Sequence, residues 1–164
     1  IDAQVLNGEG YQKVQSDSVV KLALGLTYQP VKNLYVRLYT DFMKKNETQN
    51  TLAAMVAYKG QKLTLAGEFN YQKNNKMIKN HDLTGLSCWG SYAITDKAGV
   101  FARMDNLTSK KDWNGTKDGQ TYVAGVEFNP VKGIMVAPNV QVTHPSADNT
   151  KTTTNLMVNC SYNF

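Results

Sequence analysis

Charged and phenolic side chains recur at every second position in several segments of this chain. The set consists of Lys21, Tyr35, Arg37, Tyr39, Asp41, Glu68, Arg103, Asp105 and Glu127. In a β-strand, residues two apart point to the same face, so each run places its charged groups on one side of a sheet. Opposite charges on facing walls of a water-filled space create a field that orients polar solutes. The spacing therefore predicts a wall along which solutes diffuse. An alternative role for Arg37 and Arg103 is structural, paired with Asp41 and Asp105 on their own strands.

Catalytic chemistry finds little support in the sequence. The two histidines, His81 and His144, fall in expected loops, and neither has a serine or aspartate at a spacing that would place a nucleophile beside it. Cys88 and Cys160 do not show the spacing of a metal site. We expect no catalytic residue, metal or cofactor. We also expect the two cysteines to be free thiols on a lipid-facing surface, because several strands separate them.

The elements that must position these residues show a hydrophobic period of two. About nine segments follow this pattern, with one apolar face and one wet face. They are residues 19–29, 33–43, 50–58, 62–72, 83–93, 98–106, 120–129, 133–143 and 152–164. Such alternation predicts antiparallel strands.

The connections between these segments alternate in length. Short ones are expected at 29–33, 59–61, 94–99 and 129–133, and long ones at 44–49, 73–81, 107–119 and 144–151. Aromatic residues lie on the apolar face beside the short turns: Tyr28, Tyr58, Tyr92, Phe128, Tyr162 and Phe164. Tight turns at one end, long loops at the other and an aromatic girdle are typical of outer-membrane barrels. The sequence thus predicts an all-β, antiparallel, up-and-down transmembrane β-barrel.

A soluble β-barrel or β-sandwich acting as a binding module is the alternative fold. In that fold the apolar face is the core, which explains the alternation equally well. It explains less well why long loops occur at one edge and why large polar residues fill the second face.

Composition narrows the class further. Hydrophobic residues make up 41% of the chain, and no apolar run approaches the roughly 18 to 20 residues of a membrane helix. The formal net charge is +5. Its basic excess is spread over the turns and loops, whereas the predicted wall is slightly acidic. Nucleic-acid binding needs a clustered basic stripe, so we expect no nucleic-acid partner.

Two stretches carry a resemblance to a known family. FARMDNLTSKKDW at 101–113 and YVAGVEFNPVKGIMVAPNVQ at 122–141 resemble the last hairpins of the phosphate-selective porin family of the O and P type. The shared pattern is an aromatic-x-Arg-x-Asp strand, a long loop, a Gly-x-Glu-aromatic strand, a Pro-Val-Lys turn and an Ala-Pro-Asn strand. The final segment, NLMVNCSYNF, resembles the insertion signal of Gram-negative outer-membrane barrels.

The resemblance implies a porin in the cell outer membrane, through which small polar or charged solutes, including anions such as phosphate, diffuse passively. Implied partners are outer-membrane lipid, the barrel-assembly machinery through the last strand, and further copies or other envelope proteins. The slightly acidic wall argues against strong phosphate selectivity. A second alternative is a non-conducting scaffold whose lumen is plugged by loops such as 107–119 around Trp113.

The family analogy also implies that both chain ends lie in the periplasm, which requires an even number of strands. With nine strands, residues 1–17 would begin outside the cell. Either a weak tenth strand lies in this stretch, or the chain is the C-terminal part of a larger barrel. We expect the second, with 1–17 an extracellular loop or N-terminal segment and 18–164 the barrel strands.

Overall fold

Ten strands follow one another in the computed structural model, which describes residues 1–8, 18–148 and 150–163. They are β1 (Asp2–Asn7), β2 (Val20–Val31), β3 (Leu34–Lys44), β4 (Thr48–Lys59), β5 (Leu63–Lys73), β6 (Leu83–Ala93), β7 (Ala98–Ser109), β8 (Gly119–Phe128), β9 (Ile134–Pro145) and β10 (Thr153–Tyr162). Two 3-10 turns, η1 (Asn75–Met77) and η2 (Lys110–Asp112), lie in the connections. Within the described ranges, no helix is long and apolar enough to cross a membrane.

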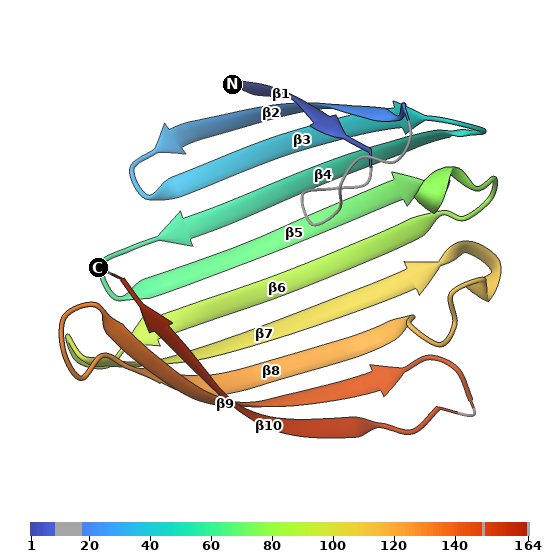
Figure 1. Cartoon of the computed structure of the whole chain (residues 1–164). Helices are drawn as coiled ribbons and strands as arrows, with labels where there is room; N and C mark the ends of the chain where they lie inside the picture. The colour runs from blue at the N-terminus through green and yellow to red at the C-terminus, as the bar shows by residue number, and fades with distance from the viewer. Residues whose placement is uncertain (9–17, 149, 164) are drawn as a thin grey trace.

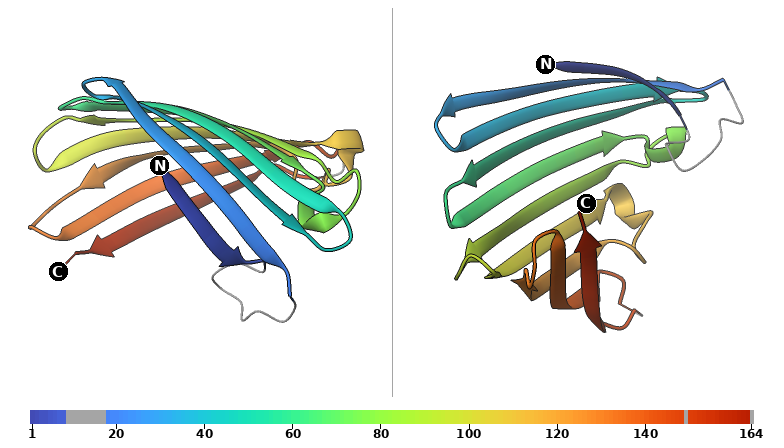
Figure 2. Two further views of the ribbon diagram at one scale, coloured as in Figure 1. Left: turned by 90° about the horizontal axis from the view of Figure 1, so that it is seen from above. Right: turned by 60° about the vertical axis from the view of Figure 1, so that its left-hand side comes forward.

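All ten strands form one antiparallel sheet in which spatial order equals sequence order (Figure 1). The up-and-down topology predicted from the alternation is therefore confirmed. The sheet twists and curls, so that it has a convex and a concave face (Figure 2). It is not closed: among the described residues, β1 pairs only with β2 and β10 only with β9.

The convex face is apolar and exposed. The exposed fraction is 53% for Leu24, 52% for Val56 and 44% for Phe69, and no second layer of described residues packs on this face. A β-sandwich would bury these side chains against another sheet. The single sheet therefore differs from a soluble sandwich, because its apolar face is exposed rather than buried.

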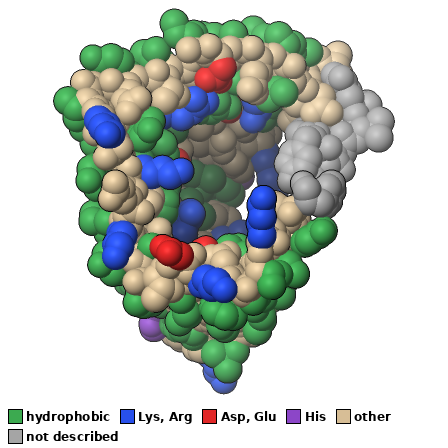
Figure 3. Space-filling view, turned by 90° about the vertical axis from the view of Figure 1, so that its left-hand side faces the viewer, with side chains coloured by type: hydrophobic (Ala, Val, Ile, Leu, Met, Phe, Trp, Pro, Cys, Tyr) green, Lys and Arg blue, Asp and Glu red, His purple; other side chains and the backbone are tan. Residues whose placement is uncertain are grey.

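The concave face contains most of the buried residues. It includes Ala23, Asp41, Met43, Gln49, Ala137 and Asn139, all less than 9% exposed. Many of them are small or polar, so the hollow between the walls is not filled by a hydrophobic core. Figure 3 shows this hollow from the short-turn end, with hydrophobic side chains on the outside and Lys and Arg side chains around the opening.

The expectation of about nine strands was one short. Asp2–Asn7 forms β1 and pairs with Val20–Gly25, where a loop or N-terminal segment was expected. This strand has six residues, and Leu6 lies on the concave side while Asn7 lies on the convex side. The apolar alternation is thereby interrupted, which is why a weak tenth strand was considered in this stretch but not favoured. Residues 9–17, the rest of that predicted segment, lie outside the described residues.

Connection lengths alternate less strictly than predicted. Residues 74–82 and 110–118 form long loops at one end of the sheet, on the right in Figure 1, and the connection between β9 and β10 lies at the same end. The connection at 45–47 belongs to the same end but is as short as the turn at 60–62. Strands β3 and β4 extend into the residues that were assigned to this loop. At the other end, the turn 129–133 requires Gly133, whose φ of 86 is left-handed.

Candidate pore wall

The register brings the predicted wall residues to one face. Glu68 lies opposite Ser87, Ser87 opposite Asp105, and the same row continues across the sheet to Thr121. Counting in steps of two from this row places Lys21, Tyr35, Arg37, Tyr39, Asp41, Glu68, Arg103, Asp105 and Glu127 all on the concave face. Whether solutes pass along them stays a prediction.

Arg103 is held from two sides on this wall. Its Nε donates to both carboxylate oxygens of Asp105, at 2.9 and 2.8 Å. Its guanidinium carbon lies 5.3 Å from the centre of the Trp89 ring, a cation–π arrangement. Ser87 Oγ donates to Asp105 at 2.5 Å. The pairing of Arg103 with Asp105 on its own strand, considered from the sequence, is confirmed.

Arg37 pairs differently from that expectation. Its two terminal nitrogens donate to the carboxylate of Asp2, at 3.1 and 3.2 Å, and Nη1 also donates to Thr27 Oγ1 at 2.7 Å. Asp41, the partner considered from the sequence, lies 3.4 Å from Lys21 Nζ instead. Asp2 is therefore a wall residue that was not predicted from the sequence, because its strand was only the less favoured alternative.

Asp41 is the most buried carboxylate of the wall, with only 3% of the residue exposed. Tyr39 donates its hydroxyl to Asp41 Oδ2 at 2.8 Å. Oδ1 accepts no hydrogen bond from the described part of the chain. Tyr39 and Lys21 thus hold one oxygen and leave the other as an unused acceptor.

Glu68 and Glu127 have amide partners instead of basic ones. Asn70 Nδ2 donates to Glu68, and Asn129 Nδ2 donates to Glu127 at 3.3 Å. No Lys or Arg of the described residues lies within 4.0 Å of either carboxylate. Their described hydrogen-bond partners are therefore uncharged.

The long-loop end is organised around Asp82. Its carboxylate accepts hydrogen bonds from the Asn74 backbone N–H at 3.0 Å and, at 3.3 Å each, from Lys110 Nζ and Tyr71 Oη. The bond from the Asn74 N–H is the main cause that lowers the pKa of Asp82 below its usual value of 3.8, although burial acts in the opposite direction. Trp113 Nε1 donates to the Asp82 carbonyl at 3.1 Å, so this network joins the loops 74–82 and 110–118.

Neither histidine ring bonds a carboxylate in the described part of the chain. His81 stacks on Trp113 with ring centres 4.1 Å apart, and Thr152 Oγ1 lies 2.7 Å from His144 Nδ1. A nucleophile and base would also need a third group that orients the base, and no carboxylate among the described residues bonds either ring. In the same part of the chain, three or more potential metal ligands do not come together.

The predicted interface aromatics lie on the convex face within a few residues of the short turns. Tyr58 pairs with Leu34 and Phe128 with Ala98, at 42% and 47% exposure. Tyr28, Tyr92 and Tyr162 occupy equivalent places. Phe164 lies outside the described residues. Cys88 and Cys160 are free and exposed on the same face, as predicted.

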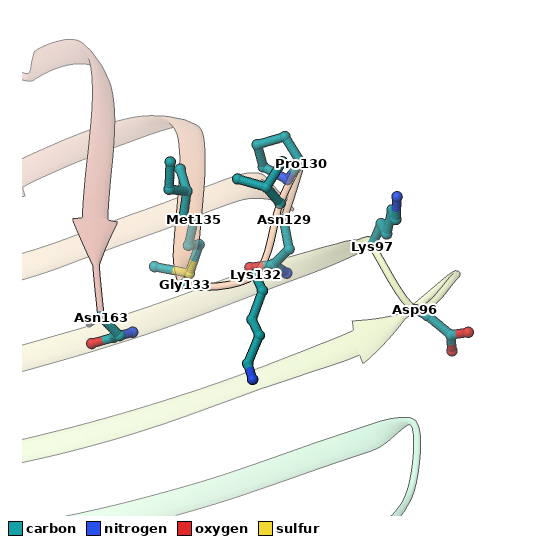
Figure 4. Close-up of a pocket in the computed structure, with 10 residues that line it drawn as sticks. Asp96, Lys97, Asn129, Pro130, Lys132, Gly133, Met135 and Asn163 are labelled. Atoms are coloured by element: carbon teal, nitrogen blue, oxygen red, sulfur yellow. The ribbon is translucent and has the colours of Figure 1, made fainter.

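The short-turn end carries exposed lysines: Lys32, Lys59, Lys62, Lys97 and Lys132. Figure 4 shows Lys97 and Lys132 beside a pocket of about 570 Å³ that Asn129, Gly133 and Asn163 also line. Neither lysine forms an ion pair with a described residue. The positive charge at this end is therefore solvated.

Comparison with known proteins gives no relative: no protein-family model, curated protein or solved structure matches the chain.

Proposed function

We propose that the protein is an outer-membrane porin through which small polar or charged solutes diffuse passively. The observation that carries this proposal is the division of the sheet into an exposed apolar convex face and a charged concave face. Transmembrane barrels need this division, because lipid contacts one face and water the other.

Energetics favour lipid as the neighbour of the convex face. Burial of apolar surface is worth about 25 cal/mol per Å², and monomeric soluble proteins rarely expose an apolar patch larger than a few hundred Å². Here exposed leucine, valine and phenylalanine side chains occur along β2, β4, β5, β8 and β10. The tyrosines and Phe128 near the short turns fit the interface between the hydrocarbon and the head groups.

The two edge strands set a requirement for the proposed barrel. An unpaired backbone N–H or C=O in hydrocarbon costs several kcal/mol, so β1 and β10 each need an antiparallel neighbour in the membrane. The resemblance to the O and P type porins supports this architecture and implies that β10 contacts the barrel-assembly machinery. In this proposal the short-turn end faces the periplasm.

Cysteine substitution at two adjacent positions tests the proposal. In a background with Cys88→Ala and Cys160→Ala, Ser87→Cys would lie on the concave face and Leu86→Cys on the convex face. The protein is reconstituted in planar lipid bilayers, and a charged, membrane-impermeant thiol reagent is added. We expect stepwise conductance that falls after modification of Ser87→Cys and stays constant for Leu86→Cys.

Each other outcome would contradict a different part of the proposed function. Protein that inserts without conductance would indicate a scaffold. Failure to insert would remove the membrane assignment. Modification of Leu86→Cys with protection of Ser87→Cys would reverse the two faces.

A further inference from the structure

One pocket of the concave wall, close to the short turns, is lined by basic and acidic side chains together. Lys59 is the last residue of β4, Lys62 lies in the turn that follows, and Glu127 is the second-last residue of β8. All three line a pocket of about 230 Å³, and Asp96 in the turn between β6 and β7 lines it too. Two bases face two carboxylates there, so the pocket has no excess of either charge.

The strand register explains why this space is open. The Ala93 N–H donates to the Lys62 carbonyl at 2.8 Å, Ala93 lies opposite Gly99, and Gly99 lies opposite Glu127. One row across the wall therefore begins at Lys62 and ends at Glu127. Three strand spacings of about 4.8 Å separate these two residues, roughly 14 Å in all. Only a methyl group and a hydrogen atom stand between them, because the two inner positions are alanine and glycine.

The charged groups of this pocket do not neutralise one another directly. Neither Lys59 nor Lys62 forms an ion pair with a described residue, and Glu127 forms none either. The Glu127 carboxylate accepts only the bond from Asn129 Nδ2 at 3.3 Å. Opposite charges therefore border one small space from two sides and remain available to a ligand.

Hydroxyl groups complete the polar lining of the pocket. In the next row of the wall, Lys59 lies opposite Thr64, and Thr64 lies opposite Ser91. Both hydroxyls border the same pocket as the lysines. A hydroxyl donates one hydrogen bond and accepts others, so these groups suit either end of a polar ligand.

The chemistry of this lining selects a ligand that carries both charges. A carboxylate beside the lysines and an ammonium group beside Glu127 would each form charge-assisted hydrogen bonds, which are stronger than neutral ones. A simple anion or cation would satisfy one side and meet a like charge on the other. The volume lies below the roughly 300 to 1,000 Å³ of pockets for drug-sized ligands, so the ligand is small.

We propose that this pocket is a binding subsite for small zwitterions, represented by a neutral α-amino acid such as alanine. Lys59 and Lys62 bind the carboxylate of the solute, and Glu127 binds its ammonium group. The subsite lies at the short-turn end, where basic and acidic side chains both border the opening in Figure 3. This inference rests on the proposed diffusion channel and specifies a solute class for it.

Saturation-transfer NMR on the protein in detergent micelles tests the inference, with L-alanine as the probe. We expect saturable binding of alanine, and binding of acetate and of ethylamine that is at least about threefold weaker. Lys62→Gln and Glu127→Gln should each weaken alanine binding by about threefold or more, as expected for removing one partly exposed charged partner. Ala93→Leu should abolish binding without a change of charge, because its side chain fills the space between the two charged groups.

Lys132→Gln is the matched control, because this lysine lies in another turn of the same end and lines a different pocket. It should leave alanine binding unchanged. An equal loss in Lys132→Gln and Lys62→Gln, or acetate binding as tight as that of alanine, would overturn the inference.

Conductance in planar bilayers without alanine separates the inference from the proposed function. Alanine binding by a protein that does not conduct would overturn the diffusion function and leave the ligand of the pocket in place. Conductance without alanine binding would overturn the subsite alone.

Discussion

The two ends of the sheet are held together in different ways. At the long-loop end, buried side chains accept hydrogen bonds from backbone N–H groups that are distant in sequence: Asp82 from Asn74, Asp118 from Ser109 and Gln49 from Lys76. At the short-turn end, backbone groups bond each other, as Gly60 N–H does to the Leu63 carbonyl at 2.8 Å. The lysine side chains at this end are exposed to water. Long connections therefore depend on buried polar side chains, whereas the tight turns depend on backbone geometry, as at Gly133, and on the exposed side chain of Thr95, which accepts from the Lys97 and Ala98 N–H groups.

Of the substitutions that test this difference between the two ends, Asp118→Ala should lower the free energy of unfolding the most. Asp118 is 3% exposed and accepts bonds from the backbone N–H and the hydroxyl of Ser109. Its removal leaves a buried N–H unsatisfied, which should cost about 2 kcal/mol in the free energy of unfolding. Urea titration in detergent micelles measures this. The control, Asp96→Ala in a short turn, should change the free energy by less than about 0.5 kcal/mol. Equal effects would remove the distinction between the ends.

Trp113→Ala should have the next largest effect. It removes both the stack on His81 and the hydrogen bond to the Asp82 carbonyl. We expect a loss of about 1 to 2 kcal/mol in the free energy of local opening, seen as faster hydrogen exchange in residues 74–82. Trp113→Phe retains a ring but no donor, and should lose about half as much. Unchanged exchange in Trp113→Ala would show that the two loops are ordered independently.

Acid should loosen the long-loop end before the short-turn end. Because the pKa of Asp82 is lowered in the folded protein, its stabilising contribution is complete above the usual pKa of 3.8 and is lost as the pH falls through the lower folded value. Hydrogen exchange at Asn74 should thus accelerate below about pH 4 relative to exchange at Gly60. In Asp82→Asn this difference between the two sites should no longer depend on pH. A pH-independent difference in the wild type would contradict the role assigned to Asp82.

Lysine substitutions at the short turns should have the smallest effect on stability. Lys97→Gln together with Lys132→Gln removes two solvated charges without described ion-pair partners, so the free energy of unfolding should change by less than about 0.5 kcal/mol. The same urea titration measures it. A loss as large as that of Asp118→Ala would show that side chains also stabilise this end.

Features that lie within one strand could be predicted from the sequence, whereas contacts between segments far apart in the chain could not. The strands β2 to β10 and the pairing of Arg103 with Asp105 follow from a period of two within one segment. The pair Asp2 with Arg37 depends on how three strands align, and β1 is too short to show a pattern of its own. Long-range loop contacts were missed for the same reason: the contact of His81 with Trp113 joins two connections whose conformations no local pattern encodes. The charged types at alternate positions predicted the wall, but only the structure shows which carboxylates lack a base.

The two free thiols are natural attachment sites for probes that measure depth in a bilayer. Cys88 sits midway along β6, opposite Gly67 and Met104, whereas Cys160 lies two residues before Tyr162, near the short turns. Both point outward from strands of known register. If the chain spans a bilayer as proposed, fluorophores attached to them would report immersion depth through quenchers placed at chosen levels of the bilayer, and the native chain could be oriented against the membrane normal without any substitution.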